Sequence, residues 1–253
     1  MGSVRHFTVR RRAAGLDSFI KDLECLTHMS LNSAHQSHRF RLLLMLLGAF
    51  VALPVAAGTL QVQVVDPDGE PVPEVAVFVE QENVPVSNSV TSETAIMDQR
   101  DIRFVPHILV VQTGTKVEFP NSDTVAHHVY SFSKPNGFVL PLYKGATPDP
   151  VVFDIDGVVT LGCNIHDNML GYIVVVDTDV FAVTDQDGNA SLSVDDAASG
   201  YKVTIWSARI RDSRDPISQT ISAGHTGKLT FTLQKSLRPR HEDSTDSIEW
   251  AEY

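Results

Sequence analysis

The sequence has 253 residues, with 20 Lys and Arg against 31 Asp and Glu and a formal net charge of −11. This acidic surplus argues against binding to nucleic acid or to anionic membrane surfaces, because both repel a negatively charged protein. With 43% hydrophobic residues, a chain of this length can form one or two domains whose cores need no disulfide support.

The first element is an export signal. Arg39 and Arg41 lead into an uninterrupted apolar run from Leu42 to Leu53, and the small residues Val55 and Ala57 follow it. A basic start, a short apolar run and an Ala-x-Ala-like end are typical of a cleaved secretory signal, and the run is too short to span a bilayer. An uncleaved membrane anchor is the alternative.

We expect the signal region to cover residues 1–57, with the signal peptide at 29–57, because Met29 would start a signal of ordinary length. The protein would then be periplasmic or otherwise exported, and soluble after cleavage. Residues 1–57 contain seven Lys and Arg and three Asp and Glu, which leaves 13 basic and 28 acidic residues and a formal charge of −15.

Cleavage also changes the cysteine count. Cys25 lies upstream of the signal and is lost, so Cys163 is the one thiol of the exported chain. An unpaired cysteine in an oxidising compartment indicates an intermolecular disulfide, a reactive thiol, a metal ligand or a buried side chain. Met97 and Met169 are the remaining methionines, and Met169 lies six residues after Cys163.

The rest of the chain predicts β-structure. Short alternating or β-branched runs recur between turn sequences such as PDGEP, KPNG and DQDGN, and no segment keeps a helical period over three turns. We therefore expect an all-β sandwich architecture. The expected strands lie at 60–65, 75–79, 108–111, 116–119, 128–132, 150–155, 158–162, 172–176, 190–194, 201–206 and 228–233.

The outer segments differ in character from the middle of the chain. A strand, a Pro/Gly turn and a second strand are predicted at Thr59–Glu80, and further strand patterns follow at Val183–Ala208 and Gly227–Gln234. These pieces resemble the carboxypeptidase regulatory-like family of prealbumin-type sandwiches, in which the two patterns follow each other almost directly. About a hundred residues separate them here, which predicts an insertion. Two unrelated flanking segments without a shared sheet are the alternative.

We expect a second β domain inserted in, or flanked by, this small β-sandwich. The last segment is charged and poor in aliphatic residues, which is typical of a disordered tail. The expected segments are 58–95 for the first part of the outer domain with its linker, 96–177 for the inserted domain, 178–236 for the second part of the outer domain and 237–253 for the tail.

The stretch LGCNIHDNMLGY places Cys163, His166 and Met169 at three-residue intervals, and His127 and His128 lie upstream. Copper that changes between two oxidation states favours two imidazoles and a thiolate in one plane, with a weak thioether as the axial ligand. Neighbouring residues on a strand face opposite sides, so only one of the two upstream histidines can enter a common pocket.

This pattern resembles the cupredoxins over roughly residues 97–177, and the short Cys-x2-His-x2-Met loop is similar to that of amicyanin. The family is a Greek-key β-sandwich in which an Asn precedes the upstream ligand His by six residues, as Asn121 precedes His127. The resemblance implies one copper ion held by His127, Cys163, His166 and Met169, with Asn121 and His128 beside the ligands.

Two positions depart from the family pattern. His128 stands where an Asn usually ties the ligand strand to the cysteine loop, and Ile165 stands where amicyanin-like loops carry Pro. The chain as a whole also resembles exported proteins labelled methylamine utilization proteins.

The resemblance implies one-electron transfer rather than enzymatic turnover. The partner expected for an acidic carrier is a basic redox protein or dehydrogenase, and not nucleic acid. The outer domain could contact carbohydrate or protein. The alternatives are a copper carrier or sensor, a copper enzyme with an open coordination position, and a surface binding module with a degenerate cupredoxin domain. A zinc site, a nucleophilic Cys163 or a loop merely packed by buried Cys and Met would also account for some of these residues.

Overall fold

The computed structural model describes residues 57–81, 93–195, 200–211, 216–222, 225 and 227–239. The predicted signal region up to residue 56, most of the predicted linker and most of the predicted tail lie outside these ranges. The described residues form strands, bridges and turns without a helix, which confirms the all-β prediction. None of them therefore forms a helix long and apolar enough to cross a membrane.

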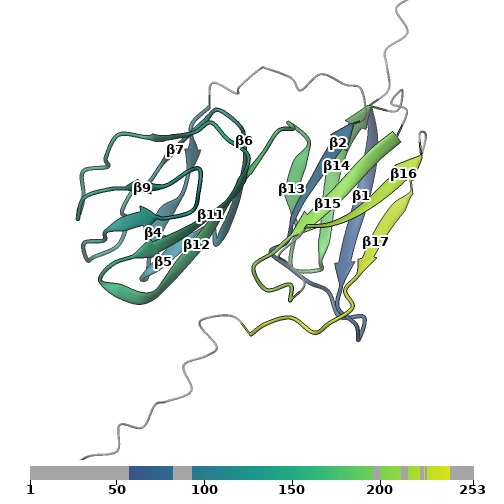
Figure 1. Ribbon diagram of the computed structural model, residues 1–253. Helices are drawn as coiled ribbons and strands as arrows, with labels where there is room; N and C mark the ends of the chain where they lie inside the picture. The colour runs from purple at the N-terminus through teal and green to yellow at the C-terminus, as the bar shows by residue number, and fades with distance from the viewer. Residues whose placement is uncertain are drawn as a thin grey trace, which may run out of the picture. The chain divides into compact units, whose positions relative to one another are not determined.

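Segments from both sides of the insertion pair in common sheets (Figure 1). Strand β1 is antiparallel to β14 and parallel to β17, while the second sheet has the order β13-β2-β15-β16. Alternate residues of these strands form one hydrophobic core. The strands are β1 (Ala57–Val65), β2 (Ala76–Gln81), β13 (Phe181–Val183), β14 (Asn189–Asp195), β15 (Gly200–Trp206), β16 (Ile217–Ser222) and β17 (Lys228–Thr232).

The sequence did not predict strand β16. Its residues ISQTIS are largely polar, and most of them are exposed. Among the residues that the structure describes, it pairs only with β15, at the end of its sheet. An edge strand needs little hydrophobic surface, and its sequence therefore lacks the alternation that identifies buried strands.

The inserted segment forms two further sheets and a hairpin. The sheet orders are β10-β7-β3 and β6-β12-β11-β8-β9, and β4 pairs with β5. Several of these strands have only two or three residues, which is too short to produce a periodic pattern. The strands are β3 (Ala95–Ile96), β4 (Asp98–Arg100), β5 (Arg103–Val105), β6 (Ile108–Gln112), β7 (Thr115–Glu118), β8 (Val129–Ser131), β9 (Phe138–Val139), β10 (Val151–Phe153), β11 (Gly157–Cys163) and β12 (His166–Val176).

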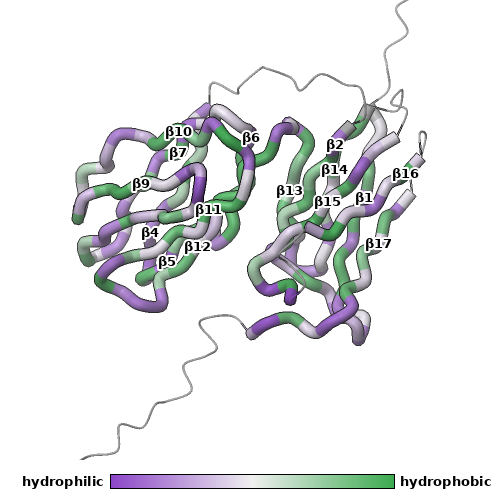
Figure 2. Tube along the Cα trace, in the orientation of Figure 1, coloured by the Kyte–Doolittle hydropathy of each residue, from purple (hydrophilic) through white to green (hydrophobic). Residues whose placement is uncertain are grey.

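The core of this segment draws side chains from both sheets, including Val117 and Phe153 from one and Leu161 and Ile173 from the other. Figure 2 shows the hydrophobic residues along these strands and hydrophilic residues at several connections. Cys163 belongs to the same cluster. The thiol is therefore part of the domain core, which holds its position by close packing.

The hairpin between β11 and β12 contains a large register shift. Gly162 pairs with Leu170, whereas its neighbour Cys163 pairs with His166, so one step on β11 corresponds to four on β12. Side chains alternate along a regular strand, and residues three apart, such as His166 and Met169, would face opposite sides. The extra residues of the bulge reverse this alternation at the end of β12. His166 therefore lies on the same face as its partner Cys163, while Met169 faces the core.

A glycine brings the neighbouring hairpin close to β12. A Cβ added at Gly171 would lie 2.7 Å from the Cβ of Phe104, an atom held rigidly by the β5 backbone. We expect Gly171→Ala to lower the free energy of unfolding by about 1–3 kcal/mol through overpacking, as measured by denaturant unfolding. Gly137→Ala is the control, because its new Cβ would meet backbone oxygens at an ordinary 3.4 Å. Equal stability of the two variants would contradict this contact.

Candidate metal centre

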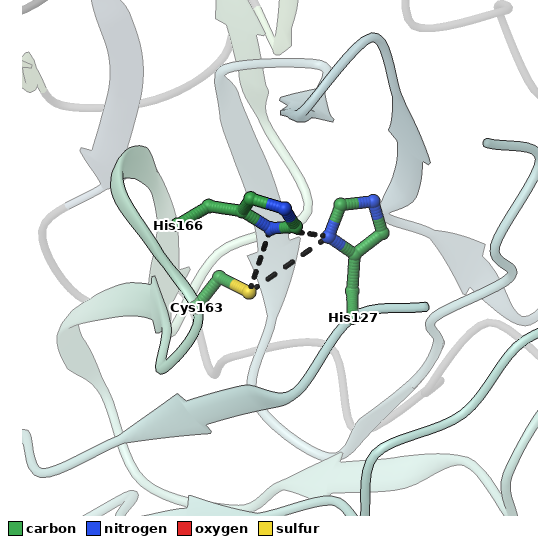
Figure 3. A group of neighbouring side chains, drawn as sticks. All are labelled: His127, Cys163 and His166. Atoms are coloured by element: carbon green, nitrogen blue, oxygen red, sulfur yellow. Dashed lines mark hydrogen bonds between the residues drawn. The ribbon is translucent and has the colours of Figure 1, made fainter. Parts of the chain in front are cut away.

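Three of the four predicted ligands bring their donor atoms together. Nδ1 of His127, Sγ of Cys163 and Nδ1 of His166 all lie within 4.8 Å of one another. The two nitrogens are 3.2 Å apart, and Sγ lies 3.8 Å from Nδ1 of His127 and 3.5 Å from that of His166. Figure 3 shows the three side chains pointing toward a common centre.

These distances suit a single metal ion. Bonds of about 2.0 Å to nitrogen and 2.3 Å to sulfur, in trigonal or tetrahedral geometry, place two nitrogens about 3.3–3.5 Å apart and nitrogen and sulfur about 3.5–3.8 Å apart. The observed separations agree with these values to within a few tenths of an ångström. A thiolate and two imidazoles also form a donor set that late first-row metals prefer.

The hairpin end explains how Cys163 and His166 meet. Only Asn164 and Ile165 separate them, and the two residues are direct cross-strand partners. Partners of this kind project from the same face of a sheet, with Cβ atoms about 4.5–5.5 Å apart. The two-residue turn thus brings the donor atoms of Cys163 and His166 to the same face of the hairpin.

The structure separates the two upstream histidines. His127 lies two residues before β8 and is fully buried, in phase with the inward-facing Val129. His128 is partly exposed, and its ring lies 6.1 Å from that of Tyr130. Alternation along the chain therefore sends His127 to the centre and His128 to the other face. His128 stands where an Asn side chain usually ties the ligand strand to the cysteine loop. Here the backbone makes this link instead, because the N–H of Asn164 donates to the His128 carbonyl at 3.3 Å.

The backbone of His127 is held by Tyr143. Each residue donates its N–H to the carbonyl of the other at 3.0 Å, forming an isolated antiparallel bridge. The Tyr143 hydroxyl donates to the Phe119 carbonyl at 2.5 Å and accepts from the buried amide of Gln99. Burial raises the pKa of Tyr143 to about 12, although the hydrogen bond from Gln99 opposes this shift. The hydroxyl is therefore a neutral donor at physiological pH, and the bridge rests on a stable polar network.

Asn121 organises the loop that precedes His127. Its side-chain amide donates to the carbonyls of Val125 and Tyr143 at 2.9 and 3.0 Å, and its Oδ1 accepts from the N–H of Asp123 at 3.0 Å. Asn121 thus contacts the loop and the residue that holds His127, as a residue that supports a ligand should. None of its hydrogen bonds is to a donor atom of the centre.

Asp123 is a neighbour of the centre that the sequence did not reveal. Its Oδ2 lies 3.0 Å from Nε2 of His127, on the side of the ring away from Cys163. Hydrogen bonds from the backbone of Ile102 and then from His127 lower the pKa of Asp123 to about 2, so it is a carboxylate at neutral pH. In the sequence it is one of several acidic residues near turns, and the spacing of four to His127 has no meaning outside the folded loop.

Met169 occupies a core-facing position on β12 and is 1% exposed. It belongs to the same hydrophobic cluster as Cys163. Its side chain is thus confined to the interior on the same strand as His166, but a cluster of this size does not by itself place its sulfur at the centre. The role of Met169 as the fourth ligand remains a prediction.

No protein-family model matches the chain, and no curated protein matches it. Among solved structures, a reduced Cu(I) form of an amicyanin variant at pH 4 is 20% identical, covering 40% of this chain and 98% of that one with a TM-score of 0.31. A second reduced amicyanin variant has the same identity and coverage with a TM-score of 0.32. A third is 21% identical over 39% of this chain and 99% of that one, with a TM-score of 0.31. Similarities with such low TM-scores do not support a metal site in this chain. The candidate centre is therefore inferred from the positions of its own donor atoms.

Proposed function

We propose that this chain is an exported copper protein that carries single electrons between redox partners, with His127, Cys163, His166 and Met169 as ligands of one copper ion. The observation that supports it most directly is the convergence of two Nδ1 atoms and one Sγ atom, from two buried side chains and one that is partly exposed. Copper bound to such a set supplies one-electron chemistry, because soft sulfur suits the reduced ion and imidazole suits both states.

The protein's part is to keep the donors in place. Cys163 and Met169 are fixed in a packed core, and the backbone of His127 is held by Tyr143. A rigid donor set changes little between two oxidation states, which keeps the reorganisation that accompanies electron transfer small. Copper is favoured over zinc because the group of converging ligands in the described residues holds one thiolate and two imidazoles, with a thioether as the candidate for the fourth position.

The burial of the site favours a carrier over an enzyme. His127 is fully buried, Cys163 is 5% exposed and Met169 is 1% exposed, whereas His166 is partly exposed. A substrate that binds the metal needs an accessible coordination position, and these side chains offer little access. An electron can instead enter and leave through the exposed edge of His166, beside the half-exposed Ile165.

The expected partner is a basic redox protein or dehydrogenase. The formal charge of −15 predicted for residues 58–253 attracts positively charged proteins over distances of about 10 Å at moderate ionic strength. Apolar contacts beside His166 would then form after the encounter, since the neighbouring Ile165 exposes 51% of its surface.

The first prediction concerns metal binding. Titration of the purified protein with one equivalent of Cu(II) should produce an intense visible thiolate-to-copper band, and Cys163→Ser should abolish it because the sulfur donor is lost. His127→Ala should also lose the band, whereas His128→Ala, one residue away, should keep it. A colourless wild-type protein at one equivalent would remove the proposed function.

The axial ligand has a test of its own. We expect Met169→Gln to retain the visible band while lowering the reduction potential, because an amide oxygen stabilises oxidised copper more than a thioether does. Met97→Leu is the matched control, since Met97 is equally buried in the same cluster and the exchange conserves volume. An unchanged potential in Met169→Gln, measured by redox titration, would show that Met169 is not a ligand.

The charge of the chain predicts how partners associate with it. The second-order rate of electron transfer to a basic c-type cytochrome should fall steeply as ionic strength rises, because screening weakens the attraction. Stopped-flow kinetics would measure this rate, with a small uncharged oxidant as the control that should show little salt dependence. A rate with the cytochrome that does not change with salt would contradict a charge-guided encounter.

A further inference from the structure

The buried ligand His127 makes a second polar contact on the side of its ring that faces away from the other donors. Its Nε2 lies 3.0 Å from Oδ2 of Asp123, and the two side chains are 0% and 9% exposed. Because a carboxylate can only accept, Nε2 is the nitrogen that donates its N–H to Asp123, which leaves Nδ1 free to bind a metal in the neutral ring. The contact thereby selects the tautomer whose free lone pair points at the centre.

Asp123 is held in place by further hydrogen bonds. The same Oδ2 accepts from the backbone N–H of Ile102 at 2.8 Å, and Oδ1 accepts from that of Thr124 at 2.6 Å. The N–H of Asp123 itself donates to Asn121. Rotation of the carboxylate away from His127 would break the bonds from Ile102 and Thr124, so its orientation toward the ring is built into the fold.

The donor from Ile102 comes from a strained turn. Asp101 and Ile102 join β4 to β5 with φ angles of 50° and 57°, in the left-handed region. Two-residue hairpin turns need such angles and favour Asn and Gly, whereas a β-branched residue adopts them only at a cost. A conformation of this kind persists where its surroundings hold it, and here the N–H of Ile102 is bound to Asp123.

We infer that Asp123 is a positioning residue that orients His127 and, through its negative charge, favours the oxidised state of the bound metal, with the turn at Ile102 holding it in place. The inference rests on the proposed copper function. A carboxylate that accepts from a ligand imidazole increases the electron donation of that ring and stabilises the higher metal charge. The hairpin β4–β5 contributes none of the four proposed ligands, yet it would help to set the reduction potential.

The test compares the copper-loaded full chain with Asp123→Asn, which keeps an oxygen acceptor but removes the charge. The visible band should remain, while Cu(II) affinity should fall by about 10–100-fold, the usual effect of removing such a partner. If Cu(I) affinity stays the same, a tenfold loss raises the reduction potential by about 59 mV for a one-electron couple. A variant with an intact band and the wild-type potential would overturn the inference and leave the proposed function standing.

A control variant separates this effect from a general effect of charge. Asp167→Asn removes one exposed charge next to His166, and screening by solvent should leave the potential close to that of the wild type. A shift in the Asp167 variant equal to that of Asp123→Asn would show that net charge alone is responsible, against the inference.

A measurement on the metal-free wild-type protein covers the case in which Asp123→Asn does not fold. Nitrogen NMR of the histidine rings should show His127 protonated at Nε2, with slow exchange of that proton because of its burial and hydrogen bond. Protonation at Nδ1 would overturn the inference without bearing on copper binding. A wild-type protein that gave no thiolate-to-copper band would instead overturn the proposed function, and the inference with it.

Discussion

The bulged end of the β11–β12 hairpin is the constraint on which the centre depends. Strand alternation would send His166 and Met169 to opposite sides, and the register shift after Gly162 removes that conflict. It allows His166 to face Cys163 across a two-residue turn. Farther along β12, Met169 and the alternate residues after it face the core. Without the extra residues, the histidine would face away from the thiol.

The rest of the site is a set of supports around this hairpin. The His127 backbone is bridged to Tyr143, its ring donates to Asp123, and the His128 carbonyl accepts from the cysteine loop. The bonds to Tyr143 and from Asn164 join segments that are distant in the chain, whereas Asp123 lies four residues before His127. Their common effect is that little side-chain or backbone freedom remains at the buried donors, which is the property a rapid one-electron site needs.

The all-β class and the central strands were predictable because buried strands carry β-branched, alternating sequences, as in YIVVV and KLTFTL. Other strands were not predictable: β16 is largely exposed, and β9 and the two strands of the β4–β5 hairpin have only two or three residues, too few to show a period. Of the site, Cys163 and His166 were evident from their spacing. The choice of His127 over His128 came from the six-residue spacing to Asn121 in the cupredoxin resemblance, because strand alternation says that one of the two enters the pocket and not which one.

The sequence by itself determined the kinds of donor atoms and their local spacing, since both are properties of neighbouring residues in the chain. Only the tertiary structure decided that His127 is the histidine that faces the thiol, that a bulge reverses the phase of β12, and that Asp123 contacts the ligand ring. These outcomes depend on which strands pair and in which register, and that choice is made by the packing of the whole core.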